Sequence, residues 1–459
     1  MMRTLLYIDP GTGSMLFSIL IGIFAALVFF VQKVILKIKF ALSGGRADKA
    51  AAAAAEKIPF LIFSDSKRYW NTFKPICDAF EARKQKVTYW TASPDDPALE
   101  EKYEYVTAEF IGEGNKAFTR LNFAKAGVLL STTPGLDVYQ WKRSKNVDWY
   151  VHVLHAAGDP TMYRMFGLDF YDAVFIAGDF MEDELRKLEE LRGITKKELP
   201  MAGVPYLDVM KARLDKEGKE EKKEGKFAEG RDVPTVLLAP AWGPSGLLTT
   251  LGPEMLEALK ATGYNIVVRP HPQSMTSEKE LMDKLMKDFP ENDSFHWNFD
   301  NDNFSVLKKS DIMISDFSGV IYDYTLVFDK PLVFTDMGVG YNRDVYDCCW
   351  LEEEPWMIRK LPEIGTPLKK DDIGNVKSII DEAIASEKFS AAREEARKET
   401  WSNIGSASDK IVEYMIEKGE EIAKKKEEER KAKEEEAKKA AGKSGKKKAA
   451  DKDKPEAEK

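Results

Sequence analysis

The stretch SDFSG, residues 315–319, lies between the apolar run IMI and the helix-like run VIYDYTLV. The first backbone N–H groups of a helix have no intrahelical partner, so this junction can receive an anion. Ser318 offers a hydroxyl donor to a phosphate, and Gly319 permits close approach of the backbone. Ser315 and Asp316 complete the candidate binding set. Asp316 is itself anionic, so capping of backbone groups or acceptance of a substrate hydroxyl suits it better. Helix capping alone is an equally good explanation of the stretch.

A second candidate, VVRPHP, places Arg269 and His271 directly after an apolar run, with prolines that fix the backbone. An arginine can pair with phosphate oxygens through two parallel hydrogen bonds. His271 is a candidate catalytic residue that donates to a diphosphate or to a departing phosphate. The alternative is a structural arginine paired with a buried carboxylate.

The third candidate, DWYVHVLHAAGDP, contains His152 and His155. Their odd spacing places them on opposite faces of a strand. His155 lies at the strand end beside small residues, and its ordinary pKa is near the working pH, so it is the candidate general base. His152 is expected in the core, and a zinc site is not predicted, because no further Cys or His ligand is nearby. His296 lies in a polar stretch and is expected on the surface.

Elements that position these residues alternate between apolar strand-like runs and amphipathic helix-like runs, which predicts parallel sheets. The alternation occurs twice, in residues 58–212 and 233–390, and the charge-dense segment 213–232 reads as a solvated linker. We therefore expect an α/β fold with two Rossmann-like domains facing a cleft, the GT-B architecture. Ligands bind such sheets outside the carboxyl ends of the strands. The chain has no G-x-G-x-x-G or P-loop motif, which argues against a dinucleotide-dependent dehydrogenase and against a P-loop nucleotide-binding protein.

The N-terminal segment predicts a transmembrane helix at residues 15–38, preceded by a short external stretch, 1–14, and followed by a linker, 39–57. A signal peptide is the alternative, but no small-residue cleavage signature follows the apolar core. The basic residues after the apolar core place the rest of the chain on the cytoplasmic side of the inner membrane, as a single-pass protein. These residues are Lys33, Lys37, Lys39, Arg46 and Lys49.

The composition of the 459-residue chain, 43% hydrophobic and 32% charged, accommodates two domains with extensions. The net charge of -8 makes nucleic acid an unexpected partner. Three cysteines form no disulfide framework or metal motif. A C-terminal helix is expected at 391–415, and residues 416–459 form a low-complexity charged tail. This tail is expected to be disordered, with partial helicity or contact with lipid headgroups as alternatives.

The motifs together resemble the CDP-glycerol glycerophosphotransferase family, which includes teichoic acid primases and polymerases. The resemblance covers roughly residues 145–340 and rests on the order of several pieces. They are LHAAGD, FIAGDFMEDELRKL, MAGVPYLDVM, LLAPAWG, VVRPHP and SDFSGVIYDYTLVFDKPLVF. It implies two Rossmann-like domains, with the N-terminal acceptor domain at 58–212 and the C-terminal nucleotide domain at 233–390, and a cytoplasmic catalytic part. It also implies transfer of glycerol phosphate, or of ribitol phosphate, from a CDP-alcohol to a hydroxyl acceptor with release of CMP.

The resemblance also implies roles for single residues. His155 matches the catalytic base, Arg269 and His271 match the strand-end phosphate site, and Ser315, Asp316 and Ser318 match the Ser-Asp-x-Ser segment on the nucleotide side. Two departures are clear. The usual His-Gly becomes HAAG, and the usual APTWR becomes APAWG, which loses an arginine and a hydroxyl.

From these observations we expect a membrane-anchored enzyme that builds a cell-envelope polymer. Its partners would be the cytoplasmic membrane, a CDP-alcohol such as CDP-glycerol, and a lipid-linked or polymeric hydroxyl acceptor. No cofactor is required by the motifs, although Mg²⁺ is compatible with a diphosphate donor. Two alternatives stay open: a nucleotide-sugar glycosyltransferase or epimerase of the same architecture, and a non-catalytic scaffold for envelope assembly.

Overall fold

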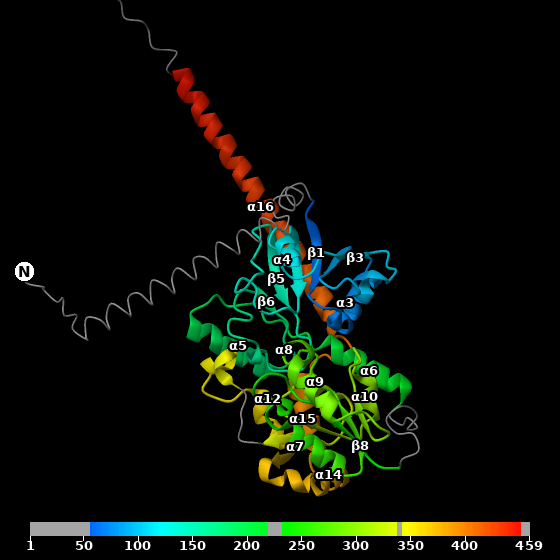
Figure 1. Cartoon of the computed structure of the whole chain (residues 1–459). Helices are drawn as coiled ribbons and strands as arrows, with labels where there is room; N and C mark the ends of the chain where they lie inside the picture. The colour runs from blue at the N-terminus through cyan, green and yellow to red at the C-terminus, as the bar shows by residue number, and fades with distance from the viewer. Residues whose placement is uncertain (1–55, 219–231, 337–341, 451–459) are drawn as a thin grey trace, which may run out of the picture.

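Two α/β lobes form the body of the protein, and one long helix, α16, runs out beyond them (Figure 1). This computed structural model describes residues 56–218, 232–336 and 342–450. The predicted membrane span at 15–38 lies outside these residues. Within the part that is described, no helix combines the length and apolar character needed to cross a membrane.

The N-terminal lobe contains a six-stranded sheet in the order β3-β2-β1-β4-β5-β6. Its strands pair in parallel throughout. This is the strand order 3-2-1-4-5-6 of a Rossmann fold, whose binding crevice opens where the order reverses. The reversal here lies between β1 and β4. The bounds are β1 Ile58–Ser64, β2 Val87–Thr91, β3 Val106–Phe110, β4 Ala126–Ser131, β5 Val147–His152 and β6 Ala173–Val174.

The C-terminal lobe repeats this topology. Its six strands have the order β12-β11-β10-β7-β8-β9, again all parallel. Counted from β7, this is the same Rossmann order, and its reversal lies between β7 and β10. The bounds are β7 Thr235–Leu238, β8 Asn265–Val268, β9 Phe295–Trp297, β10 Ile312–Ser315, β11 Leu332–Asp336 and β12 Thr366–Lys369. The expected α/β fold with two Rossmann-like lobes is confirmed.

Helices cover both sheets because their apolar faces pack on the strands, where Ile, Val and Leu are almost fully buried. The α-helices are α3 Trp70–Ala82, α4 Asn115–Leu121, α5 Asp179–Arg192, α6 Pro205–Glu217, α7 Leu247–Ala261, α8 Ser274–Ser277, α9 Lys279–Asp288, α10 Phe304–Lys309, α11 Val320–Tyr322, α12 Trp356–Arg359, α13 Leu361–Ile364, α14 Val376–Ala385, α15 Ser390–Thr400 and α16 Ala407–Ala450. The short 3₁₀ segments are η1 Lys67–Tyr69, η2 Pro97–Leu99, η3 Pro160–Met162, η5 Arg343–Val345, η6 Asp347–Trp350 and η7 Lys370–Asn375, and η4 Asp323–Val327 is a π-helical turn.

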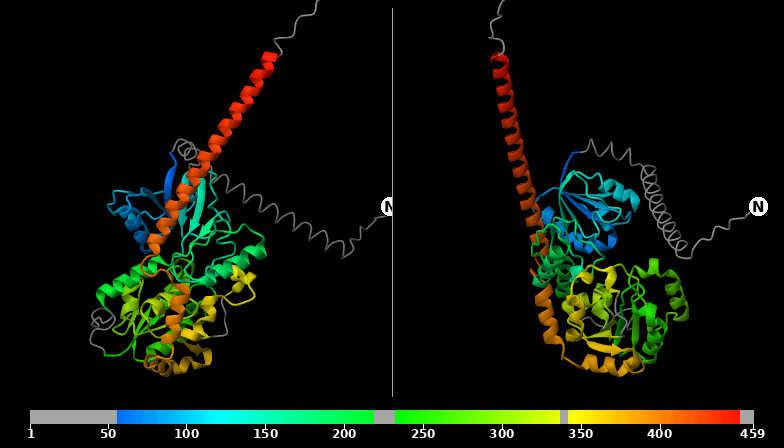
Figure 2. Two further views of the ribbon diagram at one scale, coloured as in Figure 1. Left: turned by 180° about the vertical axis from the view of Figure 1, so that it is seen from behind. Right: turned by 90° about the vertical axis from the view of Figure 1, so that its left-hand side faces the viewer.

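The chain returns to the N-terminal lobe at its C-terminal end, where α15 and α16 follow each other along the outside of both lobes (Figure 2). Ile411, Val412 and Met415 of α16 are fully buried in the core of the N-terminal lobe. The backbone of α15 passes close to Gly178, where an added Cβ would lie 1.8 Å from the carbonyl oxygen of Glu399. This return holds the two lobes together and fixes the cleft between them.

Several local predictions need correction. The expected C-terminal helix at 391–415 is two helices, and much of the charged segment 416–459 belongs to α16, so it is helical rather than disordered up to Ala450. His296 is in strand β9 and only 8% exposed, so the surface assignment was wrong. Its polar neighbours suggested a loop, whereas the strand itself is only three residues long, too short for an alternating pattern.

Candidate functional site

Two adjoining cavities open at the carboxyl ends of both sheets, and they contain most of the predicted site residues. The first, here called the Trp242 cavity, has a volume of about 420 Å³ and is walled mainly by the N-terminal lobe. The second, the Asp323 cavity, has a volume of about 330 Å³ and is walled mainly by the C-terminal lobe. The residues that line both are His155, Ala156, His271, Ser318 and Gly319. The predicted base and the predicted phosphate site therefore share one crevice.

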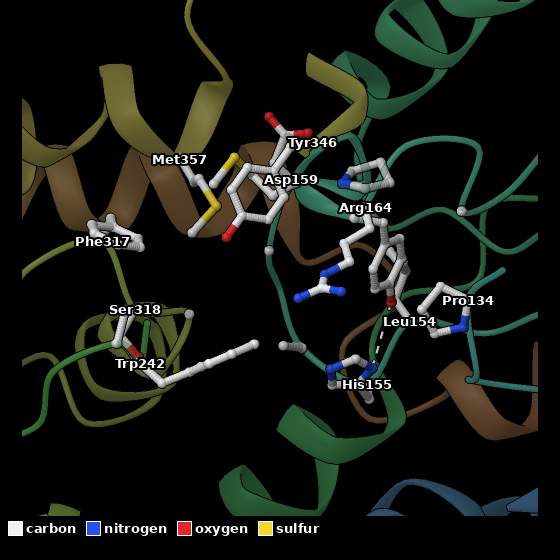
Figure 3. Close-up of a pocket in the computed structure, with 18 of the residues that line it drawn as sticks. Pro134, Leu154, His155, Asp159, Arg164, Trp242, Phe317, Ser318, Tyr346 and Met357 are labelled. Atoms are coloured by element: carbon white, nitrogen blue, oxygen red, sulfur yellow. Dashed lines mark hydrogen bonds between the residues drawn. The ribbon is translucent and has the colours of Figure 1, made fainter. Parts of the chain in front are cut away.

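His155 follows strand β5 and is held by two hydroxyl groups. Its Nδ1 atom lies 2.9 Å from Thr132 Oγ1 and 3.4 Å from the Tyr163 hydroxyl. Either oxygen can accept a hydrogen from Nδ1, which leaves the lone pair on Nε2, the ring nitrogen that points into the cavity (Figure 3). Burial lowers the pKa of His155 to about 4, because the protein around it solvates the imidazolium poorly. The folded protein thus holds His155 neutral, as a base requires.

His152 lies deeper in the same strand and is fully buried, as expected from the sequence. Its Nε2 atom lies 3.2 Å from the hydroxyl of Tyr163, the same group that approaches His155. The hydroxyl of Tyr163 therefore lies within reach of both histidines. In the described parts of the chain, no group of three or more His, Cys, Asp or Glu side chains is arranged to hold a metal ion.

His271 follows strand β8 and has a fixed tautomer. Its Nδ1 atom accepts a hydrogen bond of 3.1 Å from the backbone N–H of Gln273, so in the neutral ring the hydrogen is on Nε2. Burial lowers the pKa of His271 to about 4, with further contributions from the charges of Arg68 and His155. A neutral ring with a fixed Nε2–H is a hydrogen-bond donor, which suits contact with a phosphate oxygen.

Arg269, two residues earlier, lines the Asp323 cavity but is partly engaged by its own lobe. Its guanidinium donates to the side chain of Asn298 and, over 2.9 Å, to the carbonyl oxygen of Asp300. Neither partner is a carboxylate oxygen, so the positive charge is oriented toward the cavity but not neutralised by an ion pair. The predicted alternative, an arginine paired with a buried carboxylate, does not describe this geometry.

The segment at 315–319 divides into two functional parts. Ser318 and Gly319 line both cavities, whereas Ser315 and Asp316 line neither. Ser315 donates to the carbonyl oxygen of Ala239 over 2.7 Å. The helix after the turn, α11, has only three residues, so its dipole is a small contribution and the anion contact rests on Ser318 and the adjacent backbone N–H groups.

Asp316 holds two loops of the C-terminal lobe in register. It accepts hydrogen bonds from the backbone N–H groups of Ala241 at 2.7 Å, Leu247 at 2.9 Å and Phe317 at 2.7 Å. Of the two alternatives considered for this residue, the geometry agrees with capping of backbone groups. Asp316 thereby positions the loop that carries Trp242 against the turn that carries Ser318.

Asp323 is a site residue that the sequence analysis did not single out. It is 6% exposed, lines the Asp323 cavity, and its Oδ1 atom has no hydrogen-bond partner among the described residues. Burial raises the pKa of Asp323 to about 8, and Asn303 lies beside it. The Tyr206 hydroxyl donates to Asn303 Oδ1 over 2.5 Å and so orients that amide. One signal was present in the sequence: Asp323 lies about one helical turn beyond Gly319, on the same side of the chain.

A carboxyl pair borders the Trp242 cavity. Asp159 accepts from the backbone N–H of Thr161 at 2.8 Å, from the Thr161 hydroxyl at 2.6 Å and from the backbone N–H of Trp356 at 2.8 Å. Burial and the neighbouring Asp159 raise the pKa of Glu184 to about 9, so Glu184 carries the proton of the pair. The negative charge of Asp159 is therefore compensated by its own donors.

Comparison with known proteins agrees with the predicted resemblance. Residues 167–347 match the family model described as CDP-Glycerol:Poly(glycerophosphate) glycerophosphotransferase. The match includes Arg269, His271 and the 315–319 turn and begins after His155. No curated protein sequence matches the chain.

Solved structures share the fold. The wall teichoic acid polymerase TagF is 13% identical with a TM-score of 0.56, over 86% of this chain and 99% of that chain. S. aureus MnaA, solved with UDP, is 16% identical with a TM-score of 0.51, over 77% of this chain and 95% of that chain. The UDP-GlcNAc 2-epimerase of Methanocaldococcus jannaschii, in complex with UDP-GlcNAc and UDP, is 13% identical with a TM-score of 0.50, over 79% of this chain and 99% of that chain.

Proposed function

Since this chain is a CDP-glycerol glycerophosphotransferase-like enzyme, we propose that it transfers glycerol phosphate, or a related polyol phosphate, from a CDP-alcohol to a hydroxyl acceptor and releases CMP. The product would be a teichoic acid-type polymer of the cell envelope. One observation carries the proposal: His155 from the first lobe and His271 from the second line the same two cavities. One reacting centre can therefore contact both a base, His155, and a hydrogen-bond donor for the phosphate, His271.

The donor is assigned to the Asp323 cavity. Most of its wall comes from the C-terminal lobe, and it contains Arg269, Asp323 and the 318–319 turn. The diphosphate would contact Ser318, Gly319 and the Nε2–H of His271. The nucleoside would extend toward Asp323, whose unpartnered oxygen can accept a hydrogen from a ribose hydroxyl or from the amino group of the base.

The reaction is a direct displacement at phosphorus. His155 Nε2 takes the proton of the acceptor hydroxyl while that oxygen bonds to the phosphorus atom that bears glycerol. The bond between this phosphorus and the bridging oxygen breaks, and CMP leaves with the bond electrons. Negative charge grows on the CMP phosphate, where His271 and Arg269 are already in place. Such preorganised donors stabilise the transition state more than the ground state.

The acceptor is assigned to the Trp242 cavity, which is walled mainly by the first lobe and includes His155. We also propose that the apolar N-terminal segment anchors the enzyme on the cytoplasmic side of a membrane. Support for the anchor comes from the sequence of residues 15–38 alone. Fractionation of cells that express the full chain, compared with a chain that begins at residue 56, tests it through the loss of membrane association.

A thermal-shift titration tests the proposed donor. The full chain is titrated with CDP-glycerol, CDP, CMP and UDP-GlcNAc, and the melting temperature is recorded at each concentration. Because ligands that bind the folded state stabilise it, CDP-glycerol should raise the melting temperature most. A larger rise with UDP-GlcNAc would favour the nucleotide-sugar alternative. No rise with any nucleotide would favour a scaffold.

A further inference from the structure

Arg164 is a charged residue of the Trp242 cavity for which the mechanism has no role. It follows η3, on the same connection as His155, and its guanidinium points into the cavity between His155 and Trp242 (Figure 3). The guanidinium carbon lies 5.9 Å from the centre of the Trp242 ring, so the contact crosses from one lobe to the other. An arginine that stacks on an aromatic ring keeps its N–H groups at the edge available to a ligand.

No fold-stabilising ion pair explains this side chain. Arg164 is exposed, and among the residues described it forms no salt bridge with a carboxylate. The nearby Arg192 shows the contrast: its side chain is only 3% exposed and pairs with Asp169 at 2.7 Å and Asp347 at 2.6 Å. The backbone of Arg164 forms an isolated bridge with Tyr346, which fixes the position of the residue without using its charge.

Charge balance in the cavity points to an anionic ligand. Arg164 and Asp159 are the charged side chains that line it, and the donors around Asp159 already compensate that carboxylate. The loop that carries Trp242 continues with Gly243 and has no cation of its own at that point. The positive charge of Arg164 is therefore left for the substrate.

We propose that Arg164, stacked on Trp242, forms an anion subsite that binds a phosphodiester of the acceptor next to the hydroxyl that His155 activates. This inference rests on the proposed function and adds the residue that selects the acceptor. The acceptor class is a polyol that carries a phosphodiester near its terminal hydroxyl. Arg164 contributes two N–H groups in a planar fork that matches two phosphate oxygens. A neutral polyol would gain nothing from it.

The test uses two soluble acceptors that differ in the anion. Glycerophosphoglycerol has a phosphodiester beside a terminal hydroxyl, and diglycerol has an ether in its place. Steady-state kinetics with CDP-glycerol are measured for the wild-type chain, Arg164→Gln and Arg164→Lys. Arg120→Gln is the matched control, because Arg120 also stacks on a ring, that of Trp90, at 5.0 Å, and is remote from both cavities. Melting temperatures check that each variant is folded.

Arg164→Gln should raise the KM for glycerophosphoglycerol about 10- to 100-fold, the range expected when a charged hydrogen-bonded contact is lost. The KM for CDP-glycerol and the weak use of diglycerol should stay unchanged. Arg164→Lys should show a smaller rise in the KM for glycerophosphoglycerol than Arg164→Gln. Arg120→Gln should have the KM values of the wild type.

Three outcomes would overturn the inference. An equal rise in the KM for both acceptors would mean that Arg164 does not bind the phosphodiester. A rise in the KM for CDP-glycerol alone would mean that Arg164 binds the donor diphosphate instead. In both cases the proposed function would stand. Failure of the wild-type chain to turn over CDP-glycerol with any acceptor would overturn the proposed function itself, and the acceptor subsite with it.

Discussion

His155 and His271 belong to different lobes and line the same two cavities. Each lies beyond the carboxyl end of a strand, in one of two sheets that have the same strand order. The two have opposite hydrogen-bonding capacities. His155 Nδ1 has hydroxyl partners that can accept its hydrogen, and in that tautomer Nε2 is the base, whereas the backbone contact at His271 Nδ1 makes its Nε2–H a donor.

Replacement of the base should abolish most of the activity without loss of the fold. His155→Ala should lower kcat by about 10²–10⁴-fold, the usual contribution of general base catalysis. The KM for CDP-glycerol should change little, because the donor contacts lie mainly on the other lobe. CMP release measured against time gives both constants. His296→Gln, which lies outside both cavities, serves as the control. Turnover near the wild-type rate in His155→Ala would remove His155 from the role of base.

The two cavity histidines should make the folded chain less stable in acid. An unfolded histidine has a pKa of about 6.5, whereas the pKa of folded His155 and of folded His271 is lowered to about 4. Between these values each of the two histidines binds more protons in the unfolded chain than in the folded chain, so their contribution to the free energy of unfolding falls as the pH falls from about 6.5 toward 4. The raised pKa of Asp323 contributes the opposite slope in this window. Urea unfolding at several pH values measures this slope.

His271→Gln provides the control for that slope. Because glutamine does not titrate, the variant should lose less stability than the wild type over the same pH range. An unchanged slope would mean that the pKa of His271 is not lowered in the folded protein.

Asp323 should show a conflict between stability and binding. Its pKa is raised to about 8 by burial, so the folded chain keeps a proton that the unfolded chain loses above about pH 4. The contribution of Asp323 to the free energy of unfolding therefore falls as the pH rises through this window. Asp323→Asn removes the titration and should melt at a higher temperature than the wild type at pH 8.

The same variant should bind the donor less well. The amide keeps one acceptor oxygen but places an NH2 donor at the other oxygen position, so the KM for CDP-glycerol should rise about 3- to 10-fold, the range for one neutral hydrogen bond. Asp302→Asn, at an exposed carboxylate that pairs with Arg213, is the control. A donor KM that is unchanged in Asp323→Asn would exclude Asp323 from nucleotide binding.

Asp316 should behave as a structural residue with an effect on the site. Asp316→Ala leaves the buried N–H groups of Ala241, Leu247 and Phe317 without their acceptor. We expect a loss of about 2–4 kcal/mol in the free energy of unfolding, since each unpaired buried donor is costly. Asp316→Asn should lose less free energy of unfolding, because its amide oxygen still accepts hydrogen bonds from the backbone. Denaturant unfolding measures both, and equal stability of Asp316→Ala and the wild type would contradict the assignment.

The sequence alone predicts the parts of this fold that depend on local pattern. Short apolar runs identify β8 and β10, and the mixed run VDWYVH identifies β5. Polar residues that follow these strands must lie at the carboxyl edge of a parallel sheet. The local pattern is therefore sufficient to select His155, His271 and Ser318 as candidate site residues. It does not reveal the short or mixed strands, because β9 with its three residues contains too little pattern to detect.

Contacts between distant segments could not be predicted in the same way. The division of the 315–319 turn into capping residues and cavity residues depends on where the Trp242 loop lies. Arg164 is unremarkable in sequence, and only the approach of the two lobes places it over Trp242. The helical part of the charged tail follows from its packing at Ile411 to Met415, which anchors the start of α16.

Product analysis after mixing the full chain with CDP-glycerol and glycerophosphoglycerol tests the central claim most directly. The account predicts that one CMP appears for each glycerol phosphate added to the acceptor, that omission of the acceptor stops CMP formation, and that UDP-GlcNAc in place of CDP-glycerol gives no UDP. Formation of UDP from UDP-GlcNAc, with CDP-glycerol left intact, would contradict it.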